Sequence, residues 1–233
     1  MENDDNIKTN SNGEINEINN KNNDNLLEIF NKRYNTELTL DSNNLDLSKK
    51  NIGNEGLQLL SEIPFNQINT IKLLENNISD LTPLLKFNLA NLTQLNLSKN
   101  KIENIEILTK LNLTNLSILD LSFNKLKEIK CLQKINLNNL HELILGCNQI
   151  SDISDLEYMK CPNLQKIDLY QNEIKDITVF ERIKCPHLIE IAFANNYFDH
   201  ELIKNYDIIM NLRKRGCNVI IWGTVKQVLS DSI

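Results

Sequence analysis

The sequence predicts an α/β solenoid, an arc of about seven stacked units with a parallel sheet on its concave side. Two observations lead to this prediction. Six units share one frame of aliphatic residues that closes on asparagine, L-x-x-L-x-L-x-x-N-x-I. The asparagines recur at a spacing of 24 residues, as Asn76, Asn100, Asn124, Asn148, Asn172 and Asn196. A fixed period of this length is typical of one supersecondary unit stacked on itself.

The aliphatic frame predicts a short strand in each unit. The L-x-L pair places two side chains on the same face of a strand, because side chains alternate with a period of two. The inward positions of five units are Leu95, Leu119, Leu143, Ile167 and Ile191, followed by Leu97, Leu121, Leu145, Leu169 and Phe193. Where the chain turns after the strand, the asparagine is expected to satisfy backbone groups that lose their ladder partners. Stacking would line these amides into a structural asparagine ladder.

The second half of each unit predicts a short helical segment on the convex side. Aliphatic residues recur there in steps of three, as in Ile105, Leu108 and Leu111. This spacing suits a 3₁₀ turn or a short helix better than a strand. The wider outer layer is then expected to bend the stack around its strands.

The two ends of the chain differ from the repeats at 45–202. Residues 1–24 form an Asn-rich polar tract with few apolar side chains, so we expect a disordered tail. Residues 25–44 predict a helical N-terminal cap, because several apolar residues fall on one helical face. Residues 203–233 predict a C-terminal cap, in which a helix from His200 to Arg215 is followed by a strand from Asn218 to Trp222.

This frame is that of a leucine-rich repeat. Residues 68–202 resemble the short cytosolic type of eukaryotes, as in the protein phosphatase 1 regulator, the spliceosomal A-prime protein and the acidic nuclear phosphoproteins. The resemblance implies a solenoid that binds other proteins. The first two groups often end in a cap similar to Y-R-x-x-V-I-x-x-L-P. The segment Tyr206–Leu212 lacks its Arg and its Leu-Pro step, so their binding residues are not transferred to this chain.

The first unit departs from the frame. Lys50 stands where asparagine is expected, and the segment from Ile52 to Leu60 predicts a longer α-helix. That segment resembles the ribonuclease-inhibitor type of repeat. One such unit implies nothing about inhibitor function.

Composition and motifs argue against several function classes. The net charge is −6 in 233 residues, which disfavours nucleic-acid binding. No stretch approaches the roughly 18 consecutive apolar residues of a membrane span, so we expect a cytoplasmic monomer. The basic cluster Arg213–Arg215 could serve nuclear import, although cations in a last helical turn also complement the helix dipole. Cysteines and histidines show no ligand or catalytic spacing, so we expect no enzyme activity, cofactor or metal. Cys161 and Cys185 share a column with Leu89, Leu113 and Leu137, so we expect them to be small buried hydrophobes.

Function is therefore expected from the outward side chains of the concave sheet. We expect a non-catalytic protein-interaction scaffold that binds a partner protein there, with a regulatory subunit of a phosphatase or a ribonucleoprotein-assembly factor as the alternative. Apolar residues gather in the fourth to sixth units, between two aspartates. The predicted partner-binding residues are Ile118, Asp120, Phe123, Ile144, Cys147, Asp168 and Tyr170.

Overall fold

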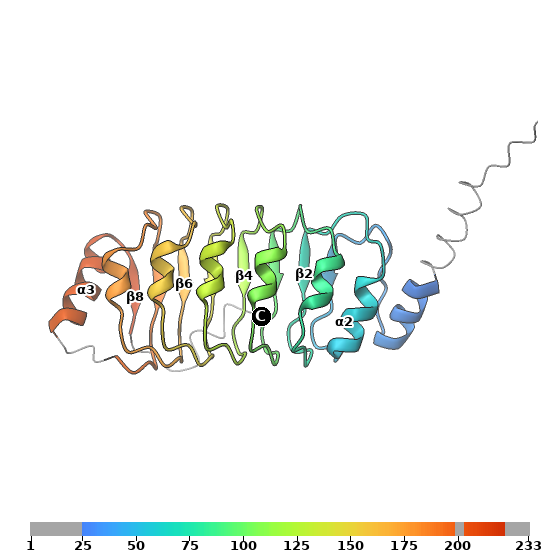
Figure 1. Cartoon of the computed structure of the whole chain (residues 1–233), viewed down its shortest axis with the longest axis horizontal. Helices are drawn as coiled ribbons and strands as arrows, with labels where there is room; N and C mark the ends of the chain where they lie inside the picture. Colours follow the sequence, from blue (N-terminus) through green and yellow to red (C-terminus); the bar gives the residue numbers. More distant parts are fainter. Residues whose placement is uncertain (1–24, 199–202, 222–233) are drawn as a thin grey trace, which may run out of the picture.

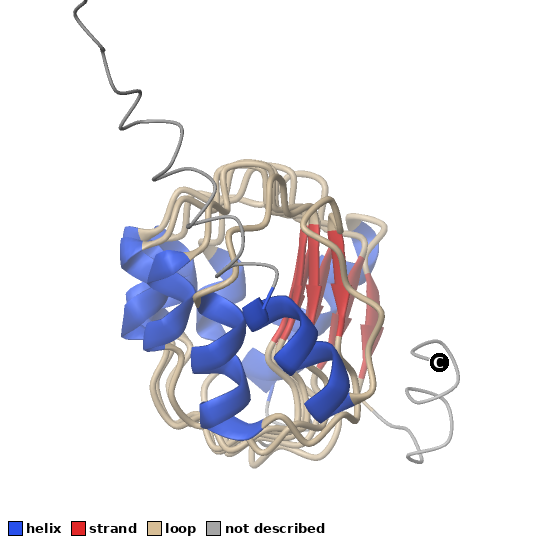
Figure 2. Cartoon of the chain, turned by 90° about the vertical axis from the view of Figure 1, so that its right-hand side faces the viewer, coloured by secondary structure: helices blue, strands red, loops and turns tan. Residues whose placement is uncertain are grey.

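The computed structural model describes residues 25–198 and 203–221, which form a leucine-rich repeat solenoid, as predicted. The units stand side by side in one row (Figure 1). Strands line one side of the row, and short helices line the other (Figure 2). The expected tail at 1–24 and the predicted strand residue Trp222 lie outside the described residues.

One parallel sheet of eight strands runs through the described residues, in the order of the sequence. Its strands are β1 (Asn44–Asp46), β2 (Thr70–Lys72), β3 (Gln94–Asn96), β4 (Ile118–Asp120), β5 (Glu142–Ile144), β6 (Lys166–Asp168), β7 (Glu190–Ala192) and β8 (Asn218–Ile220). The register repeats every 24 residues from β2 to β7, as in the pair of Ile71 and Leu95. Equivalent residues of neighbouring units therefore lie next to each other across the sheet.

The convex side carries a helix in every unit. The first unit has an α-helix, α2 (Gly53–Ser61), close to the predicted segment. The units of β2 to β6 have 3₁₀ helices, as the three-residue spacing predicts: η1 (Thr82–Lys86), η2 (Glu106–Lys110), η3 (Lys130–Lys134), η4 (Ser154–Tyr158) and η5 (Thr178–Glu181). Between the two layers lies a continuous core, to which the frame positions Leu95, Leu119 and Leu143 contribute fully buried side chains.

The ladder asparagines join each unit to the unit before it. Asn124 accepts a hydrogen bond at Oδ1 from the N–H of Ile102, at 3.0 Å. Its Nδ2 donates to the carbonyl of Leu97 in the preceding unit, at 3.0 Å, and to the carbonyl of Leu121 in its own, at 3.1 Å. Asn100, Asn148, Asn172 and Asn196 make the equivalent bonds. Each amide thus pairs backbone groups of two units that the turn leaves without ladder partners.

The first unit replaces this bridge with a contact to the N-terminal cap. Lys50 occupies the ladder position and donates from Nζ to the carbonyl of Asn35, at 2.7 Å. The cap itself is a helix at residues 25–34, in which Phe30 is fully buried. Gly56 of α2 permits the close approach of this cap, because a Cβ there would lie 2.8 Å from the ring of Tyr34.

The C-terminal cap packs its helix α3 (Ile203–Lys214) beside η5 and β8. Ile208, Ile209 and Leu212 are buried. Gly216 follows the helix with a φ of 86°, the left-handed conformation typical of a residue that ends a helix. In the basic cluster, Arg213 donates to the carbonyl of Val219 at 3.1 Å, which gives this cation a structural contact within the cap.

Two further sets of polar bonds were not predicted from the sequence. Before the strands, Asn115, Asn139 and Asn163 donate to the carbonyls of Ala90, Thr114 and Asn138, which makes a second asparagine ladder. On the convex side, an Asp or Asn accepts the N–H two residues ahead and begins the 3₁₀ helix. These residues are Asp80, Asn104, Asp152 and Asp176.

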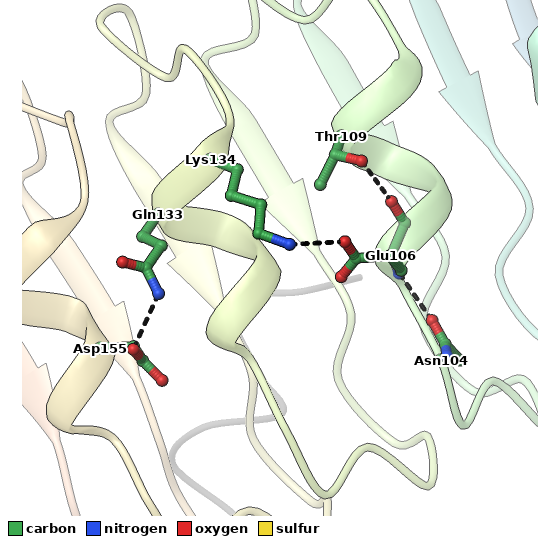
Figure 3. Close-up of polar contacts among 6 residues, drawn as sticks. All are labelled: Asn104, Glu106, Thr109, Gln133, Lys134 and Asp155. Atoms are coloured by element: carbon green, nitrogen blue, oxygen red, sulfur yellow. Dashed lines mark hydrogen bonds and ion pairs between the residues drawn. The ribbon is translucent and has the colours of Figure 1, made fainter.

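The convex helices are also linked to each other by exposed or partly buried polar side chains (Figure 3). Lys134 forms an ion pair with Glu106 at 2.8 Å, and Gln133 donates to Asp155 at 2.9 Å. In the same view Asn104 accepts the N–H of Glu106 at 2.7 Å. Exposed contacts of this kind contribute little to stability, so the buried ladder supplies the stronger side-chain hydrogen bonds between units.

Asn124→Ala is expected to lower the free energy of unfolding by at least about 3 kcal/mol, because each buried group left unpaired costs about 1–3 kcal/mol. Asn104→Ala serves as the matched control. It removes one exposed hydrogen bond just before η2 and should cost only about 1 kcal/mol. Urea denaturation of both variants measures the difference, and equal losses of stability would contradict the structural role of the ladder.

Candidate functional site

The candidate site is the sheet face, defined here as the outward side chains of the strands and of the turn that follows each strand. In β2 to β5 the middle residue is buried, and the residues on either side of it are partly exposed. Two rows of side chains therefore run across the sheet face along the solenoid. The last strand residues make one row: Asp46, Lys72, Asn96, Asp120, Ile144, Asp168 and Ala192.

A third row lies in the turn just before each ladder asparagine, where the backbone is left-handed. Its members are Lys49, Glu75, Lys99, Phe123, Cys147, Gln171 and Asn195, with φ between 51° and 61°. Bulky residues seldom adopt this conformation. Because the conformation recurs in every unit, it belongs to the turn of the repeat. Phe123 keeps it through a hydrogen bond from its N–H to the carbonyl of Gly146, at 2.9 Å.

The apolar patch is defined here as Ile118, Phe123, Ile144 and Cys147, which lie on β4, β5 and the turns that follow these strands. The ring of Phe123 is 38% exposed, and the other three side chains are partly buried. Lys99 lies with Nζ 5.5 Å from the centre of the Phe123 ring, a cation–π contact on the rim of the patch. The structure thus brings four of the predicted apolar site residues to neighbouring strands β4 and β5 and their turns.

Asp120 borders this patch and is held in a fixed orientation. Its Oδ1 accepts hydrogen bonds from the N–H of Ser122 at 3.0 Å and from its hydroxyl at 2.6 Å. Its Oδ2 accepts a bond from Asn96 Nδ2 at 3.0 Å. A carboxylate oriented by three donors is a preorganised acceptor for a partner group, because little side-chain freedom remains to be lost on binding.

The prediction that Tyr170 binds a partner is wrong, because its side chain is buried. We expected an exposed side chain, but Tyr170 is 5% exposed and its hydroxyl accepts a hydrogen bond from Asn195 Nδ2 at 2.9 Å. The physical reason is the position of Tyr170 in the repeat. It directly follows Leu169, the second inward aliphatic residue of its unit, and the turn covers the side chains at this position. The equivalent residues Ser98, Ser122 and Ala194 are buried as well. Tyr170 therefore supports the turn and is not free to anchor a partner.

Asp168 is also buried, which the alternating pattern of the strand did not predict. Burial raises the pKa of this carboxyl, while a hydrogen bond from the N–H of Tyr170 at 2.8 Å opposes the rise. The same buried environment raises the pKa of the Cys147 thiol to about 11, with the nearby charge of Asp168 as a second cause. Cys147 is therefore a neutral, weakly nucleophilic group near pH 7.

A charged cluster at the start of the strands was missed in the sequence. Lys166 forms an ion pair with Glu190 at 3.1 Å, with both side chains about one-third exposed. Burial lowers the pKa of Lys166, but the bond to Glu190 and the charges of Glu142 and Asp168 outweigh it and raise the pKa. The sequence does contain a pattern that could have predicted this cluster, because Glu142, Lys166 and Glu190 recur at the period of 24 residues. Alternating charge in one column predicts such contacts between neighbouring strands.

A contact between Ser117 and His141 is the arrangement in the described residues that most resembles catalytic chemistry. Ser117 Oγ lies 3.1 Å from His141 Nδ1. The same nitrogen lies 2.8 Å from the carbonyl oxygen of Asn139, which only a protonated nitrogen can bond. His141 Nδ1 is therefore a donor and cannot take the serine proton, so the pair lacks the nucleophile activation of a serine hydrolase.

Within 25–198 and 203–221, no cluster of three or more His, Cys, Asp or Glu side chains is arranged to hold a metal ion. The helices of these same residues are all too short or too polar to cross a membrane.

Asp168→Asn should change how stability depends on pH. The folded-state pKa of Asp168 is raised above its unfolded value, so the folded protein holds this proton more tightly. The buried carboxylate therefore lowers the free energy of unfolding near pH 7, and this penalty disappears as the pH falls through the raised pKa toward about 4. Asparagine keeps an acceptor for Tyr170 without titrating. The variant should gain stability over the wild type near pH 7 and lose that gain near pH 4.

Asp176→Asn is the control of opposite sign. The pKa of Asp176 is lowered because its carboxylate accepts the N–H of Thr178, so its contribution is present above the unfolded pKa and is lost as the pH falls. Urea unfolding of both variants from about pH 3 to 7 gives the two trends. The same trend for both would show that burial does not govern Asp168.

Comparisons with known proteins agree with the leucine-rich repeat fold described above. A family model described as leucine-rich repeats, in two copies, matches residues 114–158. Internalin C2 of Listeria monocytogenes is 26% identical with a TM-score of 0.50, over 77% of this chain and 89% of that one. A leucine-rich repeat protein of Leptospira interrogans, 21% identical with a TM-score of 0.55, is matched over 70% of this chain and 38% of its own.

No curated protein sequence matches the chain. These comparisons lend no support to the resemblance to the eukaryotic short-repeat proteins. The chain therefore has a leucine-rich repeat fold, and its solenoid is similar to that of internalin C2.

Proposed function

We propose that the protein is a non-catalytic interaction scaffold that binds a partner protein on its sheet face. The observation that carries this proposal is the apolar patch around Phe123, set in a surface of oriented polar side chains. Exposed apolar clusters with a polar rim are typical of protein-interaction sites. Leucine-rich repeat domains typically serve as protein-interaction scaffolds, and the fold similarity supports the same class of function.

The patch offers the parts that a protein interface needs. Phe123 and Ile144 supply apolar contact area, and aromatic side chains are enriched among the residues that dominate binding energy. Around them, Asp120 presents an oriented carboxylate and Lys99 a cation. Because all these groups stand on hydrogen-bonded strands and turns, a partner would meet a surface that needs little ordering on binding.

The charge of this surface favours a protein over a nucleic acid as the partner. The partly exposed acids Asp120, Glu142 and Glu190 outnumber the cations Lys99 and Lys166 on this part of the sheet face, so its net negative charge would repel phosphates. The more specific alternative, a phosphatase-regulatory or ribonucleoprotein-assembly subunit, rests on the sequence resemblance alone. The scaffold is therefore proposed without a named partner.

The double variant Phe123→Ala plus Ile144→Ala is expected to weaken binding of the principal partner by more than about 30-fold, because loss of a central anchor commonly costs about 2 kcal/mol or more. The partner is first identified by affinity capture from native cells and mass spectrometry. Binding of the purified pair is then measured by titration calorimetry. Thermal unfolding of the variant, which should change little, shows that the solenoid is intact.

The matched control lies on the helical side. Leu85 and Tyr158 are exposed by 47% and 61%, in η1 and η4. The double variant Leu85→Ala plus Tyr158→Ala removes a comparable apolar area from the opposite side and should leave affinity within about twofold. If this control loses the partner while the Phe123 and Ile144 variant keeps it, the binding surface is the convex one.

A further inference from the structure

Two thiols face each other inside the C-terminal part of the solenoid. Cys161 Sγ and Cys185 Sγ lie 3.8 Å apart, and each residue is 2% exposed. Both belong to the column that carries leucine in earlier units, in the turns that lead into β6 and β7. The pair is reduced in this structure. The burial of the two cysteines confirms the prediction that they are small buried hydrophobes. That role does not require the short distance between their sulfur atoms.

The stacking of the units places these two residues at equivalent positions of neighbouring units, with their sulfur atoms in contact. They are 24 residues apart, the same offset that pairs Lys166 with Glu190 and Ile167 with Ile191 in the strands that follow. Neighbouring strands lie about 4.8 Å apart, within the range of about 4.4–6.8 Å between the Cα atoms of a disulfide. An S–S bond of about 2.0 Å then requires each sulfur to move by only about 1 Å. No change of backbone register is needed.

The hydrogen bonding of the pair distinguishes its two members. The Cys185 thiol donates a hydrogen bond to the Cys161 carbonyl oxygen at 3.8 Å, and the two sulfur atoms share a second hydrogen bond in which either thiol can be the donor. The hydrogen bond with Cys185 lowers the pKa of Cys161, while burial opposes the change. The pKa of Cys185 is raised because it shares its proton with Cys161 and is buried. Cys161 is therefore the thiol that more readily becomes the nucleophilic thiolate.

We propose that Cys161 and Cys185 form a reversible disulfide between neighbouring units when the protein meets hydrogen peroxide. Peroxide is small enough to reach a buried pair when the adjoining turns open locally. The Cys161 thiolate attacks one peroxide oxygen, so that an S–O bond forms, the O–O bond breaks and the released hydroxide takes up a proton as water. Cys185 then attacks the sulfenic sulfur, the S–O bond breaks and a second water leaves. Two electrons pass from the thiols to peroxide.

The other described cysteines lack this arrangement. Cys131 and Cys217 are buried, and burial raises the pKa of each thiol. Cys147 is partly exposed, and its Sγ lies 3.7 Å from Gln171 Oε1. For none of these three does a thiol of another described residue lie within bonding reach. The disulfide would therefore be selective, and it would cross-link the turns before β6 and β7. This inference is independent of the proposed partner binding.

The test treats the full, reduced chain with hydrogen peroxide, removes the peroxide with catalase, and alkylates the denatured protein. We expect the treated protein to keep two unalkylated cysteines and to yield one cross-linked peptide that joins Cys161 to Cys185. The thermal midpoint should rise by roughly 5–10 °C, because the cross-link closes a loop of about 24 residues, and dithiothreitol should reverse the shift.

Cys161→Ala should abolish both the cross-link and the shift in midpoint, whereas Cys131→Ala, which removes a buried thiol without a thiol partner, should retain both. The peptide map of the wild-type protein decides the question even if a variant folds poorly. The proposal is overturned if Cys161 and Cys185 are both alkylated after treatment. It is equally overturned if either becomes a sulfinic acid or if the recovered cross-link joins other cysteines.

Discussion

The structure depends on the hydrogen bonds that each buried asparagine makes to the unit before it. Asn124 illustrates the constraint, since one amide pairs the N–H of Ile102, the carbonyl of Leu97 and the carbonyl of Leu121. Such an amide can serve two units only if their strands are in register, and the same bridge joins the first two units, where Asn76 bonds Ile52 and Leu47. The ladder therefore fixes the strand pairing, and the strand pairing fixes the rows of outward side chains. A buried polar group left unpaired is costly, so a shift in register would be unfavourable.

Much of the fold could be predicted because the ladder and the core leave a periodic signal. The inward strand positions are apolar, and every ladder position except Lys50 in the first unit is asparagine. The end of the solenoid is harder to predict, because the terminal unit has a repeat neighbour on one side only and contacts a cap on the other. Lys50 reaches Asn35 in the cap, and Gly56 admits Tyr34, which are pairings that no repeat pattern contains.

The candidate site was less predictable, because alternation tells which way a side chain points but not what covers it. Asp168 and Tyr170 alternate out of the core and are nevertheless buried, whereas Phe123 occupies the next turn position of its unit and remains exposed. The ion pair of Lys166 and Glu190 was visible as a column of charges. Outward residues do not determine the stacking, so they are free to vary, and for that reason the fold does not name the partner.

The central claim is that the ladder holds neighbouring units together, and native-state hydrogen exchange tests it most directly. The N–H groups of Ile78, Ile102, Leu126 and Ile150 each bond to a ladder asparagine of the following unit. These four amides should exchange slowly and at similar rates, because they open only when units separate. The N–H of Glu106, bonded to the exposed side chain of Asn104, should exchange far faster. Ladder amides that exchange as fast as Glu106 would contradict the account.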